Sequence, residues 1–180
     1  MDLSTSDPSS PMQRAKRPRS AAAGLYGHPI HPILVTIPIG AWTSSLVFDV
    51  AAKLSDRPDT FATGSAWLIG IGLVGAVVAA IFGGIDFSTL AKGTRAYTTA
   101  LTHMAINVVV LLLYIVNLVV RGSAGYEDVS TTALILSVVG LGLLGASGWL
   151  GGKLSYHYGV RVADEGTQAE GFVERTPHAR

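Results

Sequence analysis

Four long apolar segments constrain what this chain can fold into more than any other feature of its sequence. They cover residues 33–52, 62–82, 99–120 and 131–150. Each matches the length of about 20 residues that an α-helix needs to cross a bilayer. Asp49 is the only charged residue in these windows, whereas a helix on the surface of a soluble protein carries charges along its exposed face. The pattern predicts an all-α, polytopic membrane protein.

The segments between and around the apolar runs complete the predicted architecture. The connecting loops are short, which favours antiparallel neighbours and predicts an up-down-up-down four-helix transmembrane bundle. The expected helices span about residues 32–53, 62–85, 98–120 and 130–152, within a membrane domain over residues 25–162. The basic N-terminal tail (residues 1–24) and the C-terminal tail (residues 163–180) have little apolar surface to bury, so both are predicted to be disordered.

Composition excludes several classes of function. Charged residues make up 14% of the chain, compared with about 25% in a typical soluble domain. The 13 Lys and Arg residues nearly balance the 12 Asp and Glu residues, so the net charge indicates no nucleic-acid partner. The absence of Cys excludes disulfides and Cys-ligated iron–sulfur clusters. We find no nucleophile–base pair and no phosphate-binding loop in the sequence, and therefore expect no enzyme activity.

The distribution of cations predicts the orientation of the bundle. Four spans place both termini on one side, and ten of the 13 Lys and Arg residues lie on that side. The cations of the other side are Lys53, Arg57 and Arg121. Because cytoplasmic loops carry an excess of Lys and Arg, both termini are predicted to lie in the cytoplasm. The first partner of such a multi-pass protein is the lipid bilayer itself.

Small residues recur along the second and fourth apolar segments. The recurrent positions are Gly72, Ala76, Ala80 and Gly84 in the second segment, and Gly142, Ala146, Gly148 and Gly152 in the fourth. Small side chains at this spacing let helix backbones approach closely in a bilayer. We expect these faces to pack either inside the bundle or against a second copy of the chain, as in a homo-oligomer.

A polar stripe follows one face of the third segment. It consists of His103, Asn107, Tyr114 and Asn117, which are separated by 4, 7 and 3 residues. This helical spacing places the four side chains on one face of the helix. Because exposing polar groups to lipid is costly, we expect that face to point into the bundle. For Asn107, Tyr114 and Asn117 we expect interhelical hydrogen bonds that fix the packing.

A histidine motif, Gly27-His28-Pro29-Ile30-His31-Pro32, precedes the first segment. Each Pro disfavours α-helix in the residue before it, so His28 and His31 are expected to be extended, with His31 as the N-cap. Pro32 is then the first helical residue. Pro38 lies inside the helix, where its missing N–H removes a hydrogen bond and is expected to produce a kink.

The predicted topology brings five titratable groups to the cytoplasmic membrane boundary. They are His28, His31, Asp86, His103 and His157. Polar groups in hydrocarbon are costly and mark functional sites, so this cluster is the strongest functional signal of the sequence. Asp49 lies at the opposite boundary, where we expect it to cap its helix or to pair with Lys53, four residues later.

Three hypotheses fit the cluster. In the first, the protein binds b-type haem for electron transfer, with His28, His31 and His103 as candidate ligands and His31 and His103 as the first pair to test. In the second, His28, His31, Asp86 and His103 hold a divalent metal ion or relay protons, for transport or sensing. In the third, the protein is a structural membrane subunit without a cofactor, and its polar residues organise packing and partner contacts.

Several motifs resemble those of one family of bacterial membrane proteins. They are GHPIHPILVTIPIG at residues 27–40, Phe48-Asp49, Gly83-Gly84-Ile85-Asp86-Phe87, His103 with Asn107, and the run at residues 151–160. Together they cover about residues 26–162 and resemble the uncharacterised domain of unknown function 2231 family. The resemblance implies a four-span fold in the bacterial cytoplasmic (inner) membrane, similar in outline to small haem-bearing bundles. It also implies a redox-complex partner, because relatives occur fused or linked to redox domains.

The resemblance ranks the candidate ligands. The family's closing motif has its histidine directly before the glycine, where this chain has Tyr158. His157 lies one position early, about 100° around a helix from the expected place. The resemblance therefore favours His28, His31 and His103 as ligands over His157.

Overall fold

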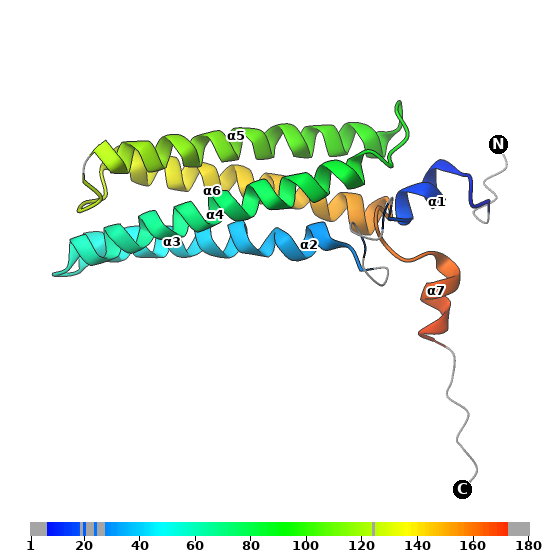
Figure 1. Cartoon of the computed structure of the whole chain (residues 1–180), viewed down its shortest axis with the longest axis horizontal. Coiled ribbons are helices and arrows are strands. Elements are labelled where there is room, and N and C mark those ends of the chain that lie inside the picture. Colours follow the sequence, from blue (N-terminus) through cyan, green and yellow to red (C-terminus); the bar gives the residue numbers. More distant parts are fainter. Residues whose placement is uncertain (1–6, 19, 21–23, 25–27, 124, 173–180) are drawn as a thin grey trace, which may run out of the picture.

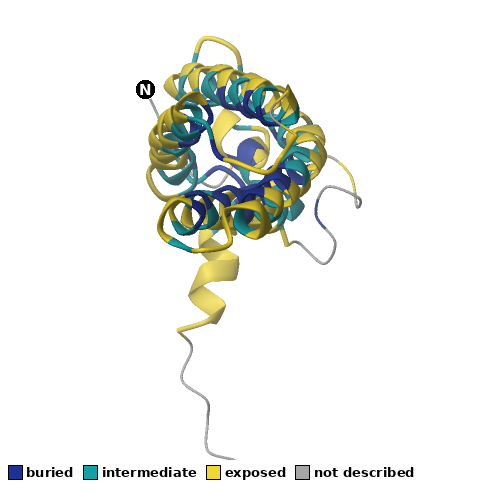
Figure 2. Cartoon of the chain, turned by 90° about the vertical axis from the view of Figure 1, so that its left-hand side faces the viewer, coloured by how far each residue is buried: buried dark blue, intermediate teal, exposed yellow. Residues whose placement is uncertain are grey.

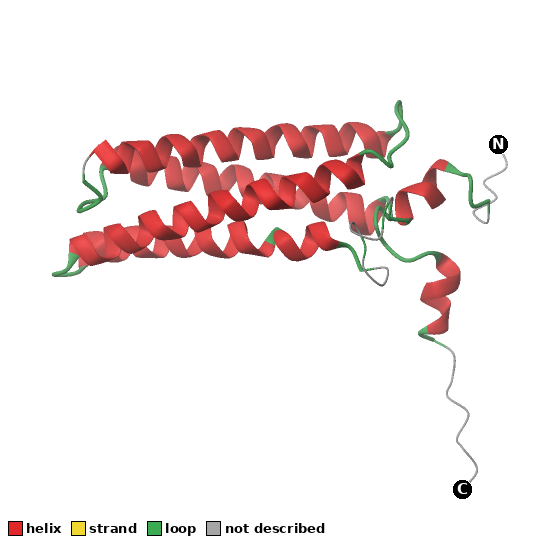
Figure 3. Cartoon of the chain, viewed as in Figure 1, coloured by secondary structure: helices red, strands yellow, loops and turns green. Residues whose placement is uncertain are grey.

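Four long helical segments form the molecule, which we analysed as a computed structural model that describes residues 7–18, 20, 24, 28–123 and 125–172. Their helices are α2 (Ile30–Leu34) with α3 (Thr36–Leu54), α4 (Pro58–Phe87), α5 (Arg95–Ser123), and α6 (Thr131–Gly152) with the π-helical turn η3 (Lys153–His157). Two shorter helices, α1 (Pro11–Lys16) and α7 (Glu165–Glu170), precede and follow them. The described residues contain helices, turns and loops but no strand (Figure 3).

All four segments are long enough and apolar enough to cross a membrane. Large apolar side chains cover the outside of the bundle; Trp67, Val119 and Trp149, for example, are 72%, 67% and 78% exposed. A surface of this kind is stable when lipid rather than water covers it. The structure therefore confirms the predicted all-α, four-span membrane fold.

The helices form a closed ring around a common interior. Helix α4 packs against α3, α5 against α4, α6 against α5, and α6 also contacts α3. Consecutive long helices run in opposite directions (Figure 1). Seen along the bundle, the buried residues face the centre and the exposed residues face outward (Figure 2). Each end of the interior is therefore lined by residues from all four segments.

Stacked aromatic rings fill the middle of the bundle. The rings of Trp42 and Tyr114 are nearly parallel, with centroids 4.1 Å apart. Glycines of α4 and α6 leave the room for them: a Cβ on Gly72 would collide with the indole, and one on Gly140 would lie 2.8 Å from the phenol ring. Of the glycines predicted to pack, Gly72 therefore faces the interior. Gly84, Gly142 and Gly148 would meet nothing within 4 Å.

The first segment is interrupted where its sequence contains prolines. Helix α2 ends at Leu34 and α3 begins at Thr36, so the break lies at Val35. Pro38 follows three residues later, and because it has no N–H it cannot donate to the Leu34 carbonyl. The prediction that His31 is an extended N-cap is wrong, because α2 already begins at Ile30 and includes His31. Pro32 is tolerated in this first turn, where the N–H that proline lacks has no helical acceptor.

Two short helices occupy part of the tails for which the sequence predicts disorder. Ser10 caps α1 by accepting from the Gln13 N–H, and Asp164 caps α7 by accepting from the Thr167 N–H. The two helices contact each other through an ion pair of 2.6 Å between Lys16 Nζ and Glu165 Oε1. Capping and this contact supply local order that apolar content alone does not reveal. Residues 1–6 and 173–180 lie outside the described part of the chain.

Candidate functional site

Two polar clusters lie inside the bundle, on either side of the Trp42–Tyr114 stack. The histidine cluster consists of His31, His103, Asn107 and Ser147. The ion-pair cluster consists of Asp49, Ser65, Asn117, Arg121 and Ser137. Each cluster draws on several spans, so each depends on the complete bundle.

His31 is held against α4. Its Nδ1 lies 2.8 Å from the carbonyl oxygen of Ala79. Because a carbonyl can only accept, Nδ1 donates this hydrogen bond, and Nε2 is the ring nitrogen left for another contact. A Cβ on Gly83 would lie 2.9 Å from the imidazole, so glycine at this position makes room for the ring.

His103 is held against α6 in the same manner. Its Nδ1 lies 2.9 Å from the carbonyl oxygen of Ser147. This contact again assigns the proton to Nδ1 and the lone pair to Nε2. The Asn107 Nδ2 group lies 3.1 Å from Nε2 and 2.7 Å from the Ser147 hydroxyl. A glycine adjoins this ring too, since a Cβ on Gly151 would lie 3.4 Å from it.

The two imidazoles form a pair. Their centroids are 6.5 Å apart and their planes are nearly perpendicular, at 88°. A metal ion about 2 Å from each of two Nε2 atoms places the ring centres about 6 Å apart. Histidine ligands of metals commonly donate their other ring N–H to a backbone carbonyl, as both rings do here. The ring separation is therefore compatible with an ion or haem iron between the two imidazoles, whereas in the structure the Asn107 amide occupies Nε2 of His103.

The other residues of the predicted boundary cluster do not join this pair. Asp86 is buried at the end of α4 and pairs with Arg161, whose Nε lies 2.9 Å from its Oδ1. His28 and His157 are exposed, and the ring of His157 contacts that of Tyr158 at 4.9 Å between centroids. Within the described residues, no three His, Cys, Asp or Glu side chains are placed to hold one metal ion.

The ion-pair cluster is built around a bidentate contact. Arg121 Nη1 and Nη2 donate to the two carboxylate oxygens of Asp49 at 2.8 and 2.7 Å. Both side chains are at most 1% exposed. Ser65 and Ser137 donate their hydroxyls to the same carboxylate at 2.6 and 3.0 Å. The prediction that Asp49 caps its helix or pairs with Lys53 is wrong.

Asn117 completes the network and links it to the predicted stripe. Its Oδ1 accepts from Arg121 Nε at 2.9 Å, and its Nδ2 donates to Ser137 Oγ at 2.9 Å. Tyr114 donates to the Ser137 carbonyl at 3.4 Å. Arg121 is not among the predicted site residues, although it follows Asn117 by four residues and so continues the stripe of α5. Lys53 instead pairs with Asp128, at 3.1 Å.

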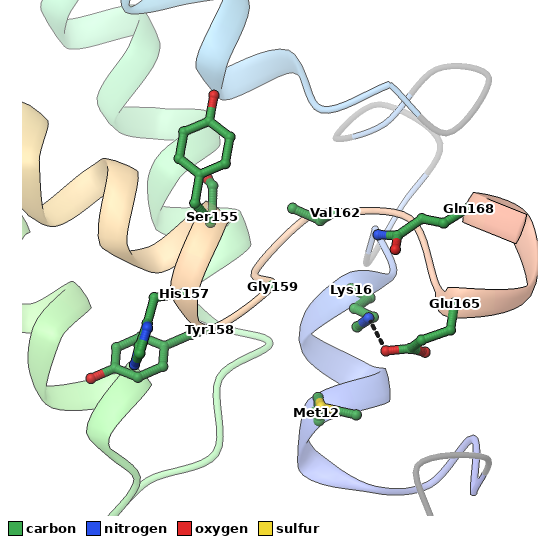
Figure 4. A pocket seen from close by; sticks show the side chains of 10 residues that line it. Met12, Lys16, Ser155, His157, Tyr158, Gly159, Val162, Glu165 and Gln168 are labelled. Atoms are coloured by element: carbon green, nitrogen blue, oxygen red, sulfur yellow. Dashed lines mark hydrogen bonds and ion pairs between the residues drawn. The ribbon is translucent and has the colours of Figure 1, made fainter. Parts of the chain in front are cut away.

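A surface cavity of about 340 Å³ lies away from both clusters, between α1, η3 and α7. Lys16, His157, Tyr158 and Glu165 are among the residues that line it (Figure 4). The lining includes neither His31 nor His103. With the ammonium of Lys16 already paired to Glu165, this cavity offers no chemistry comparable to that of the histidine pair.

The fold and the two clusters define an integral membrane protein of four spans with two groups of polar side chains in its interior. The chain belongs to the family described as "Predicted membrane protein (DUF2231)", which it matches over residues 27–164. This match confirms the resemblance and includes both clusters. The comparisons with curated proteins and with solved structures give no match.

Proposed function

We propose that this protein is a membrane redox protein that binds b-type haem between His31 and His103 and transfers electrons. One observation carries the proposal. Both histidines have Nδ1 tied to a backbone carbonyl, and their ring centres are separated by 6.5 Å. The carbonyls would orient the rings and raise the basicity of Nε2, as such partners do for other metal-ligating histidines.

The residues also indicate which kind of reaction such a site would serve. Haem held by His31 and His103 would supply one-electron chemistry, and with both ligands coming from the protein the site would not take a substrate at the iron. We therefore propose electron transfer to or from a redox-complex partner rather than an enzymatic conversion. Asn107 would have to release His103 Nε2 when the ligand binds, because its amide lies 3.1 Å from that atom.

The direct test is an absorption spectrum of the purified protein, expressed with haem supplied, before and after reduction with dithionite. We expect a Soret band and sharp α and β bands on reduction. His31→Ala and His103→Ala should each abolish the six-coordinate spectrum. His28→Ala and His157→Ala are matched controls that should leave it unchanged, since both rings are exposed and outside the pair.

A second pair of variants tests the geometry without removing a histidine. Gly83→Leu would displace the His31 ring, whereas Gly84→Leu, one residue later, would meet open space. We expect haem to be lost or five-coordinate in Gly83→Leu and normal in Gly84→Leu.

The remaining hypotheses predict other results for the same sample. Stoichiometric metal without a Soret band, lost in His103→Ala, would support a divalent-metal site in place of haem. Neither haem nor metal in folded protein would overturn the proposal and support a structural subunit. For the metal site, support from the fold is weaker, because Asp86 pairs with Arg161 and His28 is exposed.

A further inference from the structure

The Asp86–Arg161 pair lies next to the proposed haem site. On α4, Ala79, Gly83 and Asp86 are separated by four and three residues and share one face. His31 contacts the first two of them through the Ala79 carbonyl and the space above Gly83. Asp86 follows three residues after Gly83, one turn later on the same face. The carboxylate is therefore the nearest fixed negative charge that α4 presents to the histidine pair.

The chain after η3 is shaped to deliver Arg161 to this carboxylate. Gly159 and Arg161 both have left-handed backbones, with φ of 67° and 58°, and the chain turns back toward α1 there (Figure 4). The Arg161 N–H donates to the Ala15 carbonyl at 3.0 Å, and its Nη1 donates to the Lys16 carbonyl at 3.3 Å. A non-glycine residue is held in this conformation only when its surroundings enforce it. Arg161 is thus anchored by the N-terminal segment and buried against Asp86.

Charges at this place act strongly on a nearby redox centre. A negative charge stabilises the oxidised, more positive state of a haem and lowers its reduction potential, and a positive charge does the opposite. Neither Asp86 nor Arg161 is well screened, because the two side chains are only 11% and 5% exposed. The pair as a whole is neutral, so each charge offsets the effect of the other.

We infer that Arg161 is a positioning residue that holds the reduction potential of the His31–His103 site above the value that Asp86 alone would impose. The inference rests on the proposed function. It assigns a purpose to the left-handed turn and to the anchoring of the N-terminal segment: together they keep one cation beside one carboxylate near the haem.

The test is a redox titration of the reduced α band in wild-type protein and charge variants. Arg161→Gln should shift the potential downward and Asp86→Asn should shift it upward, while the double variant should return close to wild type. The band positions should stay constant, which would show that both histidine ligands remain. Asp128→Asn, at the opposite end of the bundle, is the control and should cause no shift.

Each outcome distinguishes this inference from the proposed function. If wild type binds no haem, both fail. If haem is bound normally but Arg161→Gln and Asp86→Asn leave the potential unchanged, only this inference fails, and the pair is purely structural. If Arg161→Gln does not fold, Arg161→Lys and Asp86→Asn decide the matter: the first should keep the wild-type potential and the second should raise it.

Discussion

The carboxylate of Asp49 receives hydrogen bonds from four donors on three other helices: two guanidinium nitrogens of Arg121 and the hydroxyls of Ser65 and Ser137. Moving either charge alone into a bilayer costs several kcal/mol, on the order of 3 kcal/mol on insertion scales. Pairing and complete hydrogen bonding remove most of that cost. The Asp49–Arg121 pair therefore adds little net stability to the bundle, whereas removing one of its two charges should cost much more.

We predict that removing one partner of this pair strongly destabilises the bundle. Asp49→Asn leaves the Arg121 guanidinium buried and uncompensated, which should lower the free energy of unfolding by about 3–5 kcal/mol. Equilibrium unfolding in mixed detergent micelles measures this change. Replacing both partners, as in Asp49→Leu with Arg121→Met, should recover much of the loss, because no isolated charge remains.

The control for this prediction is the exposed pair of Lys53 and Asp128, whose side chains are 42% and 67% exposed. Lys53→Gln should change the unfolding free energy by less than about 1 kcal/mol, because solvent screens the charges. A loss in Asp49→Asn no larger than that in Lys53→Gln would contradict a fully desolvated ion pair.

Residue spacing could predict much of this interior, but not which partners meet. The spacing of His103, Asn107, Tyr114 and Asn117 predicts their common face, and in the structure Tyr114 and Asn117 are completely buried. Arg121 lies on the same face and is buried, not at the membrane boundary as its place near the end of the third apolar segment predicts. Its partner Asp49 is 72 residues away. That contact depends on how α3 and α5 are rotated about their own axes relative to each other. The residues near Asp49 or near Arg121 in the sequence do not determine this relative rotation.

At the scale of elements, the contact between α1 and α7 rests on hydrogen bonds between polar side chains. Lys16 Nζ lies 2.6 Å from Glu165 Oε1, and Gln13 donates to Oε2 at 3.1 Å. Hydrogen bonds from Lys16 and Gln13 and from the backbone lower the pKa of Glu165 from 4.5 to about 2. The association of the two short helices should therefore depend on the ionised carboxylate.

We predict that α7 detaches from α1 in acid. A lowered pKa in the folded state means that the ionised carboxylate stabilises the contact above pH 4.5 and that this stabilisation is lost as the pH falls toward 2. A spin label at Ala169→Cys should become mobile over this range. Glu165→Gln should make the label mobile already at neutral pH. A label equally immobile in that variant and in acid would contradict the prediction.

The short helices also show what apolar patterning misses at this scale. The four spans follow from length and hydropathy, whereas α1 has six residues and its order depends on the Ser10 cap and on a distant partner in α7. Pro38 predicts an interruption of the first segment, and the structure has one at Val35. The start of this segment was not predicted correctly, because α2 begins two residues earlier than the expected helix. Local composition therefore predicts spans better than their ends.

At the scale of the whole molecule, the exterior of the bundle is apolar and the two polar clusters lie inside it, near opposite ends; the ion-pair cluster is buried, whereas His31 and His103 are half-buried. The ion-pair cluster lies toward the loops that follow Leu54 and Ser123, and the histidine cluster lies toward the chain termini. Which cluster faces the cytoplasm decides from which side electrons could reach the proposed haem. Orientation is therefore part of the functional proposal.

We predict that both termini and the histidine cluster lie on the cytoplasmic side, because that side holds ten of the 13 Lys and Arg residues. The chain contains no cysteine, so single cysteines report their own positions without background. Glu127→Cys and Asp56→Cys, in the two loops near Asp49, should react with an impermeant maleimide in intact cells. Gln168→Cys, in α7, should react only after the membrane is opened. The reverse pattern would place the histidine pair at the outer face and require an electron partner outside the cytoplasm.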